Sequence, residues 1–139
     1  MAAGDYRMGL NGVFNYGTAG SQAATPADNV DGVNLSLNAE TAEAKRRGKT
    51  WVASNVTYLS AELTWKMYDI EADAFLMAIK NAYTGKGKIA LYPTDVAAGE
   101  GLDADWYITG FNRTEDNDGY IMYDVTAKPT DEQRDPTWV

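Results

Sequence analysis

The sequence predicts a mainly β domain with one α-helix, built as an antiparallel β-sandwich or partly open barrel that the helix flanks. Apolar and polar residues alternate from Val56 to Tyr68, which is the pattern of a half-buried strand. The segment 69–85 places apolar residues at helical spacing. Shorter apolar segments lie on both sides of it, separated by glycine, proline and Asp-Gly turns. One helix among antiparallel strands favours a sheet that folds over a single core.

The residues before the long alternating segment are less regular. Residues 5–17 mix aromatic and branched side chains with glycines, so we expect a strand or a bent hairpin there. Residues 18–29 are small and polar and predict a loop. Asp31-Gly32 predicts a turn or bulge before a half-buried strand at 33–37. Residues 39–49 have helix-forming composition without an apolar stripe, so we expect an exposed connection or an extended arm.

The helix is expected to begin at Asp69, whose side chain can cap the first turn, and to stop at Gly85. Phe75, Leu76 and Ile79 share its apolar face and should pack on the sheet.

Three strands should follow the helix, at 88–92, 105–113 and 120–128. Pro93 is expected to end the first of them, and Asp118-Gly119 suits a tight turn between the other two. The predicted core combines the inward-facing residues of the strands and the helix: Leu35, Leu37, Leu59, Leu63, Trp65, Phe75, Leu76, Ile79, Ile89, Leu91, Ile108, Ile121 and Val125.

A chain of 139 residues suits one domain. We expect a single β-rich domain at 1–129 and a loose, polar C-terminal tail at 130–139. No apolar run is long enough for a membrane span, and the first residues do not have the pattern of a signal peptide.

The amino-acid composition limits the chemical reactions that the side chains of this protein could perform. It contains neither cysteine nor histidine, which removes thiolate nucleophiles, the commonest general base and the commonest transition-metal ligands. We therefore predict no enzyme activity, no cofactor, and no catalytic, cofactor-binding or metal-binding residues.

Charge is unevenly distributed along the chain, whose net charge is −8. A negative net charge disfavours generic binding to nucleic-acid phosphates or to anionic membranes. An acidic surface is predicted from Glu100, Asp103, Asp105, Glu115, Asp116 and Asp118. The segment 40–50 is basic, and an acidic and a basic region can complement each other between copies of the chain. The alternative interpretation of the two regions is a pair of solvated loops. The predicted inter-subunit contacts are Thr18, Gln22, Pro26, Glu43, Lys45, Arg46, Arg47, Lys49, Arg134 and Trp138.

The order of these features resembles the major tail tube proteins of long-tailed, siphovirus-type phages, which are related to the tube proteins of contractile injection devices. The similarity lies in Leu10–Gly17, in Val30–Leu37, in the basic segment Arg46–Trp51, and in the single helix followed by a strand pair that ends at Val125–Thr130. Together these cover most of residues 8–130.

The resemblance implies a structural subunit of the virion tail, made in the host cytoplasm, that forms rings, usually hexameric, which stack into a hollow tube. It implies that the partners are further copies and other tail proteins, with no membrane, and that DNA passes through the lumen only as non-sequence-specific cargo. The rings could be bridged by 17–29, by 40–50 or by the termini.

Two other functions stay open at this stage. A monomeric module that binds a sugar or peptide would present a concave patch around Trp106, Tyr107 and Tyr123. An enzyme would need two carboxylates with separated pKa values in a pocket.

Overall fold

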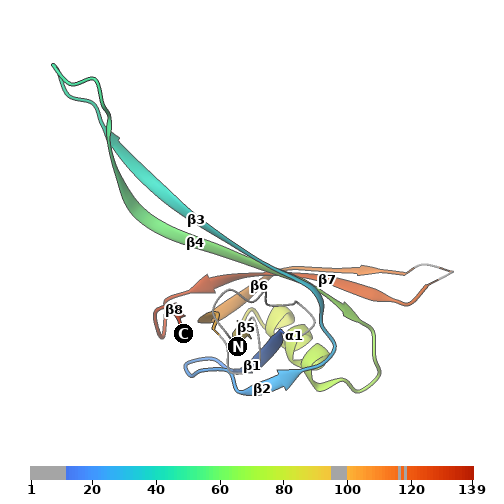
Figure 1. Cartoon of the computed structure of the whole chain (residues 1–139). Coiled ribbons are helices and arrows are strands. Elements are labelled where there is room, and N and C mark those ends of the chain that lie inside the picture. Colours follow the sequence, from blue (N-terminus) through green and yellow to red (C-terminus); the bar gives the residue numbers. More distant parts are fainter. Residues whose placement is uncertain (1–11, 95–99, 116, 118) are drawn as a thin grey trace, which may run out of the picture.

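The computed structural model describes residues 12–94, 100–115, 117 and 119–139 (Figure 1). Part of the strand or hairpin expected at 5–17 therefore lies outside the described residues, as do Asp116 and Asp118. The elements in chain order are β1 (Val13–Thr18), β2 (Thr25–Ala27), β3 (Asp31–Ala44), β4 (Ala53–Tyr68), α1 (Ala74–Thr84), β5 (Lys88–Thr94), β6 (Leu102–Thr114), β7 (Met122–Thr130) and β8 (Thr137–Trp138).

One antiparallel sheet contains these strands, in the order β2-β1-β5-β6-β7-β4-β3, and β8 pairs with the start of β6. In that order three strands separate β1 from β4, yet the rings of Phe14 on β1 and Trp65 on β4 lie 5.0 Å apart. The sheet must therefore curl until its two halves face each other. This confirms the predicted fold class, an antiparallel sandwich or partly open barrel with one helix.

The helix contributes the aromatic side chain of Phe75 to the place where the two halves of the sheet meet. Phe75 of α1 lies 5.5 Å from Phe14, 4.7 Å from Tyr16 and 6.2 Å from Trp65, measured between ring centroids. Contacts among large rings contribute beyond their buried area, so the four side chains hold β1, β4 and α1 together. Within the described residues, no helix has both the length and the apolar character needed to cross a membrane.

The predicted core is largely confirmed. Nine of its members are buried: Leu63, Trp65, Phe75, Leu76, Ile79, Ile89, Leu91, Ile108 and Val125. Leu35 and Ile121 are half-buried. The prediction is wrong for Leu37 and Leu59, which are 56% and 82% exposed, because both lie where β3 and β4 have left the body of the domain.

The helix begins later than predicted. Asp73, not Asp69, is the N-cap, and its side chain accepts a hydrogen bond from the backbone N–H of Leu76 (3.2 Å). Asp69 instead donates its backbone N–H to the carbonyl of Ile121 (2.9 Å). Ala72 then has φ +60°, which no helical residue adopts, so the helix can start only after it.

Three other boundaries differ from the predictions. The expected loop at 18–29 contains the short strand β2, which pairs with β1. Pro93 does not end β5, which runs to Thr94 beside β1. The segment 39–49 is an extended arm as far as Ala44, because β3 continues along β4 to that residue. The bulge predicted at Asp31-Gly32 is confirmed by a register shift between Asp31 and Asn34.

The close approach of β5 and β6 generates a prediction about Gly101. A Cβ atom on Gly101 would overlap the backbone carbonyl of Pro93, whereas one on Gly87 would meet nothing within 4 Å. We expect Gly101→Ala to lower the free energy of unfolding by about 1–3 kcal/mol or more. Gly87→Ala should leave it nearly unchanged. Urea denaturation checks this, and equal stabilities of the two variants would contradict it.

Candidate assembly surfaces

The β3–β4 hairpin projects far beyond the rest of the domain (Figure 1). β7 covers β4 only from Leu63 to Tyr68, so the earlier residues of β4 pair with β3 alone. We call residues 36–62 the arm. Ten residues of β4 belong to the arm. At about 3.3 Å per residue, these ten residues place the tip of the arm roughly 30 Å from the body.

One face of the arm continues the hydrophobic core into solvent. Directly paired residues share a face, and the pairs Leu35–Leu63, Leu37–Ala61 and Ala39–Leu59 are all apolar. Exposure rises along this face, from 0% at Leu63 to 82% at Leu59. A two-stranded ribbon is at best marginally stable by itself in water, so this face is suited to being covered by another chain.

The tip of the arm, residues 45–52, combines positive charge with an exposed indole. Lys49 donates its backbone N–H to the carbonyl of Arg46 (3.2 Å), and Gly48 has φ +80°, which closes the turn. The tip holds four of the 12 basic residues of the chain and no acidic one, so the remainder has a net charge of −12. Trp51 is 87% exposed and Val52 43%.

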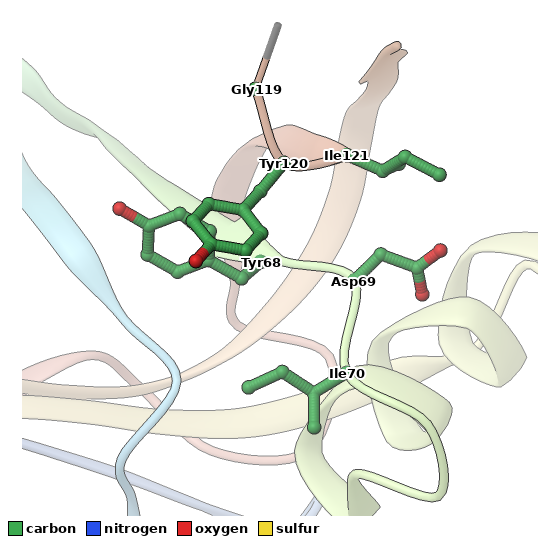
Figure 2. Close-up of a pocket in the computed structure, with 6 residues that line it drawn as sticks. All are labelled: Tyr68, Asp69, Ile70, Gly119, Tyr120 and Ile121. Carbon is green, nitrogen blue, oxygen red and sulfur yellow. The ribbon is translucent and has the colours of Figure 1, made fainter. Parts of the chain in front are cut away.

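The described residues line two hollows that bear on assembly. The first, about 580 Å³, lies between the base of the arm and the C-terminal segment, and we call it the groove; its lining includes Leu37, Leu59, Leu102, Pro136 and Trp138, with Asp131 and Asp135. The second, about 680 Å³, lies at the other end of β4, and we call it the tyrosine pocket; it is lined by Tyr68, Asp69, Ile70, Gly119, Tyr120 and Ile121 (Figure 2).

A buried ion cluster fixes the C-terminal segment to β6. Asp105 is completely buried, and its carboxylate accepts hydrogen bonds from the backbone N–H of Gly20 (3.0 Å) and from Nε of Arg134 (3.0 Å). Nη1 of Arg134 lies 2.9 Å from Asp103. Burial lowers the pKa of Arg134, but its hydrogen bonds to Asp105 and Asp103 outweigh that effect and raise the pKa above its usual value.

Further contacts hold the segment after Pro129, which therefore is not the loose tail that we predicted. Val139 exchanges both backbone hydrogen bonds with Gly101 (2.9 Å), and β8 pairs with β6. Glu132 accepts hydrogen bonds from Tyr107 (2.9 Å) and Lys88 (3.2 Å).

The contacts of Glu132 depend on pH. Its hydrogen bonds from Tyr107 and Lys88 lower its pKa, and the same bond to Glu132 raises the pKa of Tyr107. Because the pKa of Glu132 is lowered on folding, its contribution is present above the ordinary glutamate pKa. It is lost as the pH falls through the lowered value.

The structure corrects three of the predicted site residues. Asp103 and Asp105 are not part of an acidic surface, because β6 places both carboxylates inside, against Arg134. Arg134 in turn is used within the chain, and its side chain is only 19% exposed. Glu100 and Glu115 are exposed, as predicted, and Asp116 and Asp118 lie outside the described residues.

The other predicted contact residues form three groups on the surface. Thr18, Gln22 and Pro26 are exposed on the β1–β2 hairpin. Trp138 is 52% exposed in the groove. The remaining five are exposed at the outer end of the arm: Glu43, Lys45, Arg46, Arg47 and Lys49.

The patch proposed for a sugar- or peptide-binding module does not form. Trp106 is 0% exposed and donates its indole N–H to the carbonyl of Leu91 (3.1 Å), and Tyr123 is 5% exposed. Among the described residues, no group of three or more acidic side chains is placed to hold a metal ion.

Sequence reasoning did not single out Val56, Ile70 and Tyr120, which are 62%, 50% and 82% exposed. The length of β4 is a signal that could have pointed to Val56. Its 16 residues are about three times the usual strand length, more than the body of a small domain can cover.

No protein-family model and no curated protein matches the sequence. Solved structures do match. The chain is 12% identical to a protein in the tail of an empty gene transfer agent particle, with a TM-score of 0.70 over 96% of this chain and 99% of that one. It is 10% identical to the SPP1 tail tube protein, with a TM-score of 0.75 over 96% and 78%.

A structure of an extracellular contractile injection system, its sheath/tube terminator, also matches at 10% identity, with a TM-score of 0.65 over 99% of both chains. The chain therefore has the fold found in phage-type tail tubes and contractile injection devices. The resemblance predicted from the order of elements is confirmed at the level of the fold.

The buried ion cluster generates a second prediction. We expect Arg134→Met to destabilise the protein by about 3–5 kcal/mol, because it leaves the carboxylate of Asp105 buried without its cation. The matched control is Arg113→Met, which removes an exposed ion pair with Glu115 (3.1 Å) and should change stability little. Urea denaturation of both variants measures the difference. An Arg134 variant as stable as the control would contradict the assignment.

Proposed function

We propose that this protein is a structural subunit that assembles into rings, which stack into a hollow tube of the phage-tail type. The observation that carries the proposal is the arm, a ribbon of about 30 Å whose apolar face its own chain leaves uncovered. In a monomer this face would favour aggregation, whereas in a tube another copy covers it.

The proposed contact between copies is of the head-to-tail kind, in which the arm of one copy meets a different surface of the next. The arm extends from one end of β4, and β7 joins the other end of β4 to the body. Head-to-tail contacts close into rings or continue as filaments, and a stacked tube uses both. A ring of six copies is supported by the C6 symmetry of the tail structure that shares the fold.

The proposal includes a lumen through which DNA passes without sequence-specific contacts. Its support is electrostatic, because the chain outside the tip carries a net charge of −12 and would repel phosphates rather than hold them. Under this proposal the protein resides in the virion tail, its partners are further copies and other tail proteins, and it performs no catalysis.

Concentrating the purified protein tests the proposal. We expect rings and tubes in negative-stain images and a matching large species in sedimentation velocity. Leu59→Glu should abolish both, because it places a charge on the apolar face of the arm, and it should leave the monomer folded because Leu59 is 82% exposed.

Met77→Glu is the matched control, since Met77 is 55% exposed on α1, away from the arm, and it should still assemble. A wild-type chain that stays monomeric at high concentration, without rings or tubes, would overturn the proposal.

A further inference from the structure

Two uncovered apolar surfaces of this chain differ in shape. At the arm tip, Trp51 and Val52 lie at the end of the projecting hairpin and are 87% and 43% exposed. The tyrosine pocket is concave, and its rim residues Tyr120 and Ile70 are 82% and 50% exposed. Trp is among the residues that most often dominate a protein interface when it inserts into a pocket.

The pocket is formed before any partner arrives. The backbone N–H of Asp69 donates to the carbonyl of Ile121 (2.9 Å), which joins its two walls. The Asn29 side chain holds Tyr68 by accepting from its N–H (2.9 Å) and donating to its carbonyl (2.6 Å). The rings of Tyr68 and Tyr120 pack edge to face with their centroids 5.9 Å apart. Both side chains are drawn in Figure 2. A preformed pocket loses little entropy on binding.

The charges of the two surfaces are opposite. The tip has four basic residues and no acidic one. The described residues of the two segments that carry the pocket, 66–73 and 113–124, include five acidic side chains and two basic ones. Because the charges are opposite, electrostatic attraction draws the tip of one copy toward the pocket of another. Repulsion between the like charges keeps two tips apart.

The groove is the competing receptor. It lies between the base of the arm and the C-terminal segment, and the chain's own Trp138 already forms part of its wall. The tyrosine pocket lies at the far end of β4, nine residues from Leu59 and therefore about 30 Å away. Docking there leaves each copy with a free arm or a free pocket for the next one.

We infer that the arm tip of one copy docks in the tyrosine pocket of another, with Trp51 inserted beside Tyr68 and Tyr120 and the basic residues of the tip facing the acidic segments around the pocket. The inference rests on the proposed tube assembly and names the contact that joins its copies.

Disulfide trapping tests the contact, since the chain has no cysteine of its own. The double variant Thr50→Cys/Glu71→Cys places one thiol beside Trp51 and one beside the pocket, at exposed positions outside its lining. The reference variant Thr50→Cys/Asp135→Cys joins the tip to the groove instead. Both are oxidised under assembly conditions and resolved on denaturing gels, beside negative-stain images.

We expect tubes from both double variants. Tubes of the 50/71 variant should give a ladder of cross-linked chains, and tubes of the 50/135 variant should give no ladder. Tubes that give the ladder only with the 50/135 pair, or with neither pair, would overturn the docking while leaving the proposed function in place. Absence of rings and tubes from the wild-type protein is a different result, and it would reject the proposed function and this contact with it.

The contribution of the indole is measured separately. Trp51→Ala should raise the concentration needed for assembly by about thirtyfold, the effect of losing one interface hot spot. Met77→Ala removes an apolar side chain that is 55% exposed on α1, away from the arm, and should leave that concentration unchanged. Circular dichroism and melting of the Trp51 variant should match the wild type, because this side chain is outside the core. If Trp51→Ala and Met77→Ala changed the concentration needed for assembly equally, the result would count against the insertion of Trp51 into the pocket.

Discussion

The apolar face of β4 is the feature on which the rest of the structure depends. Its inner part supplies Leu63, Trp65 and Met67 to the core, where Trp65 meets Phe14 and Phe75 and closes the sheet. Its outer part, with Leu59, has the same pattern of side chains and no cover. One strand therefore stabilises the monomer and also leaves an apolar surface that the domain itself does not bury. In the proposed assembly another copy covers this surface, so folding and assembly would use the same alternation of residues.

The C-terminal segment extends this organisation to the other side of the body. Asp105 lies in the middle of the sheet, and the N–H of Gly20 and the guanidinium of Arg134 offset the cost of burying its carboxylate there. This cluster orders the turn after β1 and the chain after β7 together. It also places Trp138 beside Leu37 and Leu59, so the wall of the groove depends on a charge pair that solvent hardly reaches.

Local patterns predicted the strands, the helix and most of the core, because alternation and helical spacing depend on near neighbours in sequence. They could not say whether a face is covered. Leu59 and Leu63 belong to one alternating series, yet one is 82% exposed and the other 0%, which depends on where β7 ends beside β4. Asp105 was placed on the surface for a similar reason, since its partner Arg134 is 29 residues away. An exposed connection or arm was expected at 39–49 because that segment has no apolar stripe, whereas the tyrosine pocket joins segments about fifty residues apart and needed the structure.

The continuity of β4 also decides how the protein would respond to mechanical force. A pull on the arm acts along the axis of β4, while the hydrogen bonds from Leu63–Tyr68 to β7 run across it. These bonds are therefore sheared together instead of being opened one after another from an end. Tension between neighbouring copies would pass directly into the central strands of each domain, and extension of the tube would be resisted by the best-packed part of the fold.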